Sequence, residues 1–393
     1  MAAETIRRPM KRPSYYEFFC GGGMVRAGLG AGWECLLAND IDAKKARAYA
    51  ANWGTDRLRV GDIHDLSADD APSRADLAWA SFPCQDLSLA GPGGGLKGKR
   101  SGAFWGFHAL MEGLVRAGRA PKIIALENVV GALTSNRGAD FVAICRAVQE
   151  LGYRFGALTI DAAHFTPQSR PRLFIVAMQR TLSVPEGFAR DQPSDDFASR
   201  ALRQAQALLP ADLAADWLWW ALPAPPKRNV ALADLLETSP KDALWRSREE
   251  TEALLAIFSQ GSRAKFEEAL RRKGRVVAAV YRRMRPDGEG GRRMRAEARF
   301  DGLAGCLRTP RGGSSRQFVL VAEGGVVRSR LLSAREAARL MGLPEEYQLP
   351  ARYNEAYHLV GDGVAAPVVR FLAEHILESL ARSDARPVLE AAE

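Results

Sequence analysis

The stretch Ala75-Asp76-Leu77-Ala78-Trp79-Ala80-Ser81-Phe82-Pro83-Cys84-Gln85 joins an apolar run to a polar segment that carries a cysteine. Residues 75–80 are mostly apolar, and such a short run is typical of a buried β-strand. In α/β folds, ligands and reactive groups gather at the carboxyl ends of parallel strands. The stretch therefore predicts a buried strand of an α/β fold that ends at a candidate reactive thiol, Cys84.

Two later segments follow the same design. Ile123-Ile124-Ala125-Leu126-Glu127-Asn128-Val129 is an apolar strand pattern that carries a carboxylic acid near its end. Gln168-Ser169-Arg170-Pro171-Arg172 places two arginines before another apolar run. A thiol, an acid and paired guanidinium groups can serve as nucleophile, proton donor and anion clamp.

Around these segments, residues 14–180 alternate short apolar strands with helical patterns. Strands are expected at 15–20, 34–39, 58–60, 75–80, 123–126 and 173–178, and helices from 24 and at 43–52, 103–116 and 141–151. Such alternation predicts a doubly wound α/β fold, with a parallel sheet covered by helices on both faces. We expect a catalytic domain at 14–182, a smaller, loop-rich domain at 183–329, and a return to the first domain at 330–382, including a C-terminal amphipathic helix.

The composition sets further bounds. The chain has 393 residues, 47% of them hydrophobic and 26% charged, as in ordinary globular proteins. Residues 1–13 lack the apolar core of a secretory signal, and no apolar run is long enough to cross a membrane. The five cysteines are scattered without metal-ligand spacing. We therefore expect reduced thiols, no metal site, no membrane partner and a cytoplasmic location.

The positive charge is concentrated in one region. The net charge is +9, and residues 263–299 contain thirteen Lys and Arg against five acids. A localised basic block is the electrostatic footprint of a polyanionic partner, although an arginine-rich solvated surface gives the same pattern.

A candidate nucleotide site precedes the thiol strand. Cys20-Gly21-Gly22-Gly23 lies between the first strand and the first helix, where glycines allow close approach of a ligand to the backbone. Asp40 and Asp62 each follow a later strand, and acids at such positions bind nucleosides. The loop is not the GxGxxG fingerprint, which weakens an interpretation as a dinucleotide-dependent oxidoreductase.

Taken together, these segments resemble the bacterial DNA (cytosine-5)-methyltransferase family. The resemblance is carried by Pro83-Cys84-Gln85, Glu127-Asn128-Val129, Gln168-x-Arg170-x-Arg172 and the run Arg330–Pro344. It implies a Rossmann-like sheet that binds S-adenosylmethionine and a separate target-recognition domain. It also implies that Cys84 adds to carbon 6 of cytosine, that Glu127 holds the ring, and that Arg172 and Arg170 position the nucleotide.

The same resemblance implies a set of cofactor-binding residues: Phe19, Gly21, Gly23, Asp40, Ile41, Asp62, Ile63, Pro83, Asp362 and Val364. Two positions depart from the family's pattern. Met24 stands where a further glycine is usual, and Asp362 stands where the family's Gly-Asn-Ser-Val motif has asparagine. The second change adds a carboxylate near the cofactor, which can tune affinity for the sulfonium or weaken binding.

The partner that the resemblance implies is double-stranded DNA, from which the target base must be flipped. The candidate DNA-binding residues are Gln85, Ser88, Arg100, Arg308, Thr309, Arg311 and Arg316. We expect a nucleoid-associated monomer, acting either beside a restriction endonuclease or alone.

Two alternatives stay open at this point. The same chemistry can act on tRNA, although the long basic insertion favours duplex DNA. The chain can also be an inactive DNA-binding regulator of the same fold, a hypothesis that the two departures keep open and that intact Cys84, Glu127 and Arg172 oppose.

Overall fold

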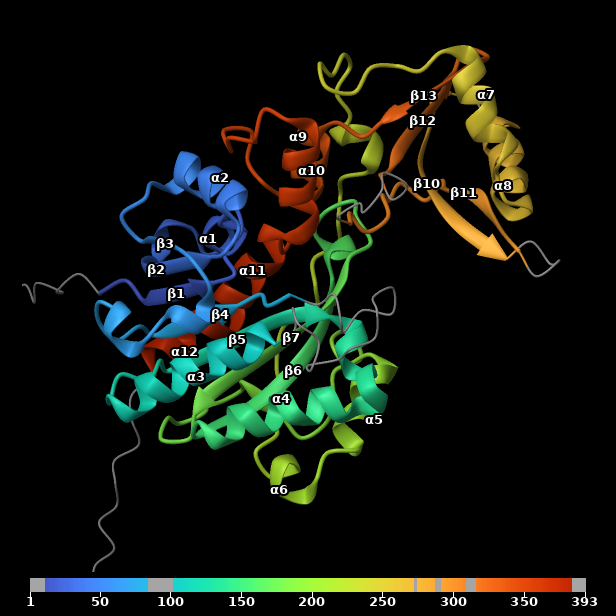
Figure 1. Ribbon diagram of the computed structural model, residues 1–393. Coiled ribbons are helices and arrows are strands. Elements are labelled where there is room, and N and C mark those ends of the chain that lie inside the picture. Colours follow the sequence, from blue (N-terminus) through green and yellow to red (C-terminus); the bar gives the residue numbers. More distant parts are fainter. Residues whose placement is uncertain (1–10, 84–101, 272–273, 287–290, 309–315, 384–393) are drawn as a thin grey trace, which may run out of the picture.

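A computed structural model describes residues 11–83, 102–271, 274–286, 291–308 and 316–383. Its larger body is built on a seven-stranded sheet in the order β3-β2-β1-β4-β5-β7-β6 (Figure 1). The strands in that order are β3 (Leu58–Val60), β2 (Glu34–Asp40), β1 (Ser14–Phe18), β4 (Leu77–Ala80), β5 (Ile123–Val129), β7 (Pro171–Gln179) and β6 (Tyr153–Asp161). The order reverses between β1 and β4, where α/β sheets bind their ligands.

The sheet is mixed, whereas the sequence pattern predicts a parallel one. β1 to β5 pair in parallel, but β7 runs antiparallel to both β5 and β6. β6 has no counterpart among the strands expected from the sequence. Residues 162–170 connect β6 to β7, and a connection this short suits an antiparallel pair because a parallel crossover needs a dozen residues or more.

Helices cover both faces of this sheet. One face packs against α1 (Met24–Leu29), α2 (Ala43–Trp53), α11 (Ala366–Leu372) and α12 (Glu378–Arg382), with a π-helical turn at Ala373–Leu377 between the last two. The other face packs against α3 (Ala103–Arg116), α4 (Ala139–Glu150) and α5 (Arg200–Ala207). Consecutive residues on β1 divide between the two cores: Tyr15 joins the first and Tyr16 the second. The doubly wound arrangement is thus confirmed (Figure 1).

The chain after β7 first runs along the outer strand β6. This part contains β8 (Ala189–Arg190), α6 (Ala211–Ala214) and β9 (Trp219–Trp220). The backbone of Phe155 on β6 exchanges hydrogen bonds with Asp216 and Leu218, at 3.0 and 2.7 Å. Trp220 is buried, and its Nε1 donates to the carbonyl of Val176 at 3.1 Å.

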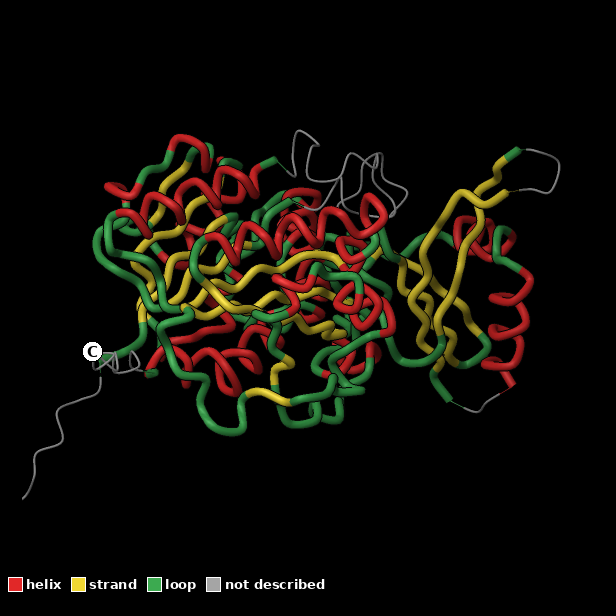
Figure 2. The backbone as a smooth tube through the Cα atoms, turned by 90° about the horizontal axis from the view of Figure 1, so that it is seen from below, coloured by secondary structure: helices red, strands yellow, loops and turns green. Residues whose placement is uncertain are grey.

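A smaller antiparallel sheet stands apart from the large one in both views (Figures 1 and 2). Its order is β11-β10-β12-β13, formed by β11 (Arg292–Arg299), β10 (Val276–Pro286), β12 (Phe318–Glu323) and β13 (Val326–Leu331). α7 (Arg248–Ala256) and α8 (Gln260–Arg271) pack on it around Leu254, Phe266 and Val280. This body has its own small core.

The chain then returns to the large body through α9 (Ala334–Leu340), α10 (Tyr353–Asp362) and α11. At the start of this return, Arg330 and Glu336 form an ion pair at 2.6 Å with both side chains fully buried. Gly28 lets α1 and α11 touch, since a Cβ there would lie 2.5 Å from Cβ of Val369. Among the described residues, no helix is both long and apolar enough to cross a membrane.

Candidate active site

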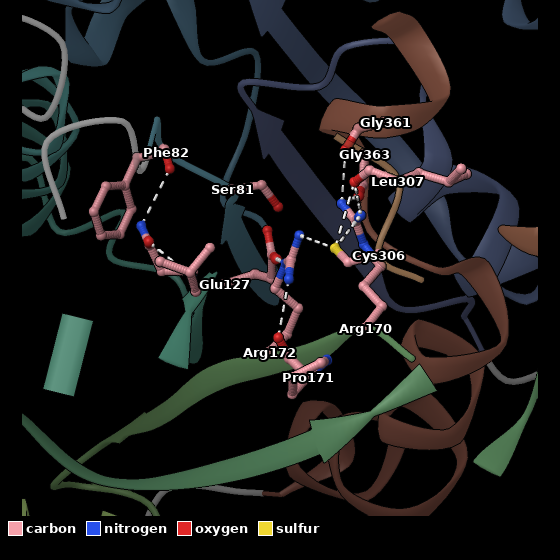
Figure 3. A network of polar contacts seen from close by, with 12 residues as sticks. Ser81, Phe82, Glu127, Arg170, Pro171, Arg172, Cys306, Leu307, Gly361 and Gly363 are labelled. Carbon is pink, nitrogen blue, oxygen red and sulfur yellow. Dashed lines mark hydrogen bonds and ion pairs between the residues drawn. The ribbon is translucent and has the colours of Figure 1, made fainter. Parts of the chain in front are cut away.

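The segment that leads to Cys84 lies beside Glu127. β4 and β5 pair with Ala80 opposite Leu126, so the residues after Ala80 run next to those after Leu126. Asn128 donates from Nδ2 to the carbonyl of Phe82 at 3.2 Å and so fixes the segment to β5 (Figure 3). Cys84 itself lies outside the described residues, as does Gln85, and Pro83 is the last described position before them.

Glu127 forms an ion pair with Arg172. The distance from Arg172 Nε to Glu127 Oε1 is 3.1 Å, and the two side chains are only 14% and 8% exposed. They come from β7 and β5, where Arg172 stands opposite Val129 and therefore diagonal to Glu127. The antiparallel position of β7, which the sequence pattern did not predict, is what brings the arginine to the acid.

Arg170 ties together two distant parts of the chain. Its Nη1 donates to the carbonyl of Leu307 at 3.0 Å, and its Nη2 donates to those of Gly361 and Gly363 at 2.9 and 2.5 Å. The side chain is 2% exposed. The two arginines thus have different structural roles: Arg172 faces Glu127, while Arg170 anchors the backbone around the site (Figure 3).

Cys306 is a residue of this site that sequence reasoning missed. Its Sγ lies 3.4 Å from Nη1 of Arg170 and 3.9 Å from Nη2 of Arg172. Burial disfavours its thiolate, but the positive charges of Arg170 and Arg172 outweigh burial and lower the pKa of the thiol. The sequence offered one signal, namely that Cys306 precedes Arg308 and Thr309, two of the predicted DNA-binding residues, by two and three positions.

Gln168, the first residue of the arginine motif, docks that segment. Its Nε2 donates to the carbonyl of Leu340 at 2.8 Å, and its Oε1 accepts from the backbone of Leu307 at 3.0 Å. The side chain is fully buried. The motif therefore holds the chain that returns from the smaller body, in addition to supplying two guanidinium groups.

The glycine loop is held by Asp40. Its Oδ2 accepts from the backbone of Gly21 at 2.8 Å and its Oδ1 from that of Asp42 at 2.8 Å. Burial raises the pKa of Asp40, against the opposing effect of nearby Lys45. Phe19 and Gly21 have φ angles of +58° and +53°, so the loop turns in a conformation that favours glycine at the second position. Gly23, also predicted here, has φ of +77° and precedes α1.

Asp62 lies at the neighbouring strand end. The backbone of Gly61 donates to the carbonyl of Asp40 at 3.1 Å, which places the two acids side by side. Asp62 Oδ1 accepts from the backbone and ring nitrogens of His64, and these bonds lower the pKa of the carboxyl. Close to these acids, Ile41 and Val60 expose 66% and 54% of their surface, whereas Ile63 is buried.

This edge of the sheet fits a nucleoside. Carboxylates suit hydroxyl and amino donors, since each oxygen accepts two hydrogen bonds, and exposed aliphatic side chains suit the face of a base. Asp362 and Val364 border the same edge. Lys45 Nζ lies 2.7 Å from Oδ2 of Asp362, and Val364 is buried behind the turn.

A basic hairpin projects from the smaller body. On β10 and β11, Arg283 stands directly opposite Arg295, and Arg285 opposite Arg293. Like charges opposite one another destabilise a sheet, and an anionic partner lying along the hairpin would relieve that repulsion. The positive charge of Arg285 is partly neutralised by Glu297, whose Oε1 lies 2.7 Å from Nε of Arg285.

Three more guanidinium groups gather at the base of this hairpin. Arg246 and Arg282 both lie over the ring of Phe318, at 5.2 and 5.1 Å from its centroid. Burial together with the charges of Arg246 and Arg316 lowers the pKa of Arg282. Arg316 was predicted from the sequence, whereas Arg246 and Arg282 were not singled out. Arg308 is exposed, and Ser88, Arg100, Thr309 and Arg311 lie outside the described residues.

Three features define a Rossmann-like methyltransferase. They are the strand order, the acids at the ends of β2 and β3 that suit a nucleoside, and the strand that leads to the thiol beside an acid and two arginines. Residues 14–378 match the model of the C-5 cytosine-specific DNA methylase family. The chain therefore belongs to this family. Its activity is C5 methylation of cytosine in DNA, and membership implies dependence on S-adenosylmethionine.

Individual proteins agree with the assignment. The type II methyltransferase M.HpaII of Haemophilus parainfluenzae is 26% identical over 389 residues, covering 93% of this chain and 90% of that protein. The fold is similar to that of Schizosaccharomyces pombe Dnmt2 methyltransferase, with a TM-score of 0.55, 18% identity, and coverage of 94% and 99%. It is also similar to a putative DNA modification methyltransferase encoded within an Escherichia coli prophage, with a TM-score of 0.54, 16% identity, and coverage of 92% and 97%.

Proposed function

We propose that the Cys84 thiolate adds to carbon 6 of a cytosine flipped out of duplex DNA, so that carbon 5 takes the methyl group. The addition converts the ring to an enamine, which is nucleophilic at carbon 5. Loss of the proton from carbon 5 then expels the thiolate and restores the double bond. The observation that carries the proposal is the position of Phe82, whose carbonyl accepts a hydrogen bond from Asn128, the residue that follows Glu127 on β5. Cys84 follows Phe82 by two residues in the sequence.

Glu127 and Arg172 act on the ring in this proposal. Glu127 holds nitrogen 3 and the exocyclic amine and shares a proton as charge develops there. Arg172 fixes the carboxylate through Nε. Its Nη atoms contact the Pro171 carbonyl and Cys306 Sγ, and a guanidinium group in this position suits the ring carbonyl oxygen of the base. Arg170 positions the Leu307 and Gly361–Gly363 backbone around the pocket and does not touch the base.

S-adenosylmethionine supplies the electrophilic methyl group when bound. We assign the glycine loop, Asp40, Asp62 and the exposed faces of Ile41 and Val60 to its nucleoside. Asp40 keeps the loop open by binding its backbone and retains lone pairs for ribose hydroxyls. Phe19, Ile63, Pro83 and Val364 shape the pocket.

The basic hairpin and the Arg246–Arg282–Arg316 cluster support contact with duplex DNA. Facing arginines on β10 and β11 gain a counter-charge when phosphates lie along them. We assign the smaller body and the segment around Arg308 to target recognition. A DNA substrate would place the enzyme with the nucleoid in the cytoplasm. The relatives are type II methyltransferases, which makes a restriction endonuclease the expected biological partner; we propose a monomeric enzyme.

Methyl transfer from tritiated S-adenosylmethionine to unmethylated duplex DNA and to total tRNA tests the function, with bisulfite sequencing of the DNA. We expect label in DNA at one recurring cytosine context. Cys84→Ala should abolish transfer while duplex binding persists, because the nucleophile is lost and the basic surface remains. Cys145→Ala is the matched control, since that thiol is buried on α4 away from the site.

Two results would refute the proposal. Full activity of Cys84→Ala would remove the covalent mechanism. Label confined to tRNA would transfer the same chemistry to an RNA substrate.

A further inference from the structure

The segment Gly361–Gly363 forms the turn at the C-terminal end of α10, and it lies between the arginine site and the cofactor edge. On its inner side, Nη2 of Arg170 binds the carbonyls of both Gly361 and Gly363, at 2.9 and 2.5 Å. The residue between these two glycines is Asp362. The turn thus connects Arg170, a residue of the arginine motif, to Lys45, the partner of Asp362.

Asp362 contacts Lys45 on α2. Lys45 Nζ lies 2.7 Å from Asp362 Oδ2, and the two side chains are 24% and 33% exposed. Burial disfavours the charge on Lys45, but Asp362, together with Asp40 and Asp42, outweighs burial, and the pKa of Lys45 is raised. The aliphatic part of Lys45 lies over the glycine loop, since a Cβ placed on Gly21 would be 4.0 Å from its Cδ. A single side chain therefore covers the loop and holds the turn.

The acids at this edge of the sheet need a positively charged partner such as Lys45. Asp40 is buried and has both carboxylate oxygens on backbone amides, and Asp362 brings a second carboxylate to the region. Lys45 acts electrostatically on both acids. Because charges a few ångströms apart at a half-buried site are incompletely screened, removing either member of the pair changes the net charge next to the loop by one unit.

We propose that Lys45 and Asp362 form a positioning pair for the cofactor site, in which the lysine neutralises the carboxylate and fixes the Gly361–Gly363 turn against the glycine loop. The inference rests on the proposed cofactor site. It adds Lys45 as a functional residue and explains how Asp362 is accommodated at a position where the family's motif has a neutral amide.

A double-mutant cycle tests the pair. Lys45→Met, Asp362→Asn and the double variant are compared with the unsubstituted chain by calorimetric titration with S-adenosylmethionine and with S-adenosylhomocysteine. The first ligand carries a sulfonium and the second a neutral thioether, so their ratio reports on local charge. Thermal unfolding without ligand is the second readout. The matched control is Lys44→Met with Glu355→Gln, since this ion pair joins the same two helices at 3.2 Å and its lysine is 63% exposed.

Each single variant should weaken S-adenosylmethionine binding about fivefold, and the double variant should recover to within about twofold, as expected for two residues that act as a unit. Asp362→Asn removes a negative charge from the site and should penalise the cationic S-adenosylmethionine more than S-adenosylhomocysteine. Lys45→Met should shift that ratio the other way. The Lys44 and Glu355 control should leave both dissociation constants unchanged.

Additive single effects, unchanged dissociation constants, or equal effects from the control pair would overturn the inference while leaving the proposed function intact. Failure of the unsubstituted chain to bind S-adenosylmethionine would instead overturn the proposed cofactor site. The two failures are therefore distinguishable.

Discussion

Nε of Arg172 lies 3.1 Å from Oε1 of Glu127, and the pair links β7 to β5 at the point where the thiol segment passes. The contact exists because β7 is antiparallel to β5, which sets the arginine diagonal to the acid. It holds the carboxylate in one orientation before any base arrives, and such preorganisation is what a ring-holding acid requires.

Glu127→Gln should therefore reduce methyl transfer about 10²–10⁴-fold, because the amide keeps the shape but cannot share the proton. Duplex binding should be preserved, since Glu127 is not on the basic surface. Single-turnover transfer and a duplex shift assay measure the two effects. Glu150→Gln, on the exposed end of α4, is the control. Near-normal transfer by Glu127→Gln would exclude the proposed role.

The Cys306 thiol should react faster than the other described cysteines. Burial opposes its ionisation, but Arg170 and Arg172 lower its pKa, whereas burial raises the pKa values of Cys20, Cys35 and Cys145. Thiolate therefore forms on Cys306 at lower pH. In a Cys84→Ala background, a small thiosulfonate reagent followed by peptide mass spectrometry should label Cys306 first at pH 7. Slower labelling of Cys306 than of Cys35 would contradict the prediction.

Gly363 and Met24 should be coupled in stability. A Cβ on Gly363 would lie 2.1 Å from Sδ of Met24, so Gly363→Ser should overpack the contact and cost about 1–3 kcal/mol. Met24→Ala removes the sulfur and should restore part of that loss in the double variant, although it opens a cavity by itself. Urea unfolding measures each value. Gly32→Ser is the control, since a Cβ there meets nothing within 4 Å.

Stability should depend on pH through Glu17. Its side chain is fully buried on β1, and burial raises its pKa from 4.5 to about 8, against the opposing charge of Arg26. Because the folded-state value is the higher one, the stability it contributes is complete below about pH 4.5 and is lost as the pH rises through 8. Glutamine stays neutral at every pH. The free energy of unfolding of Glu17→Gln should therefore rise relative to that of the unsubstituted chain over this pH range, by on the order of 2–4 kcal/mol.

Unfolding free energies at pH 5 and pH 8 decide this point. The advantage of Glu17→Gln should be larger at pH 8, and a difference that does not change with pH would show that Glu17 does not titrate in this range. Glu112→Gln, on the exposed side of α3, should behave like the unsubstituted chain.

Much of the fold could be predicted from local pattern. The ranges 58–60 and 103–116 coincide with β3 and α3, because short apolar runs and a 3.6-residue periodicity are local properties. β6 was missed and β7 was expected to be parallel, since strand direction depends on the connection and not on the composition of either strand. The domain limits at 183 and 329 stay predictions. The chain from 189 to 220 still packs along β6 before the smaller sheet begins.

The residues of the candidate site likewise fall into those that could be predicted from the sequence and those that could not. Glu127, Arg170 and Arg172 were found from residue type and order, but Cys306 and Lys45 were not, because each gains its role from residues more than a hundred positions away. The predicted roles of Cys84, Gln85, Ser88, Arg100, Thr309 and Arg311 stay predictions, as these residues lie outside the described part of the chain.

The sequence by itself determined the family, the catalytic residue types and the order in which the strands present them, because motifs and periodicity are written along the chain. The tertiary structure alone decided which arginine faces Glu127, which one anchors the closing turn, and how Asp362 is neutralised. These outcomes depend on strand direction and on contacts between segments hundreds of residues apart, where charge and close packing act through space.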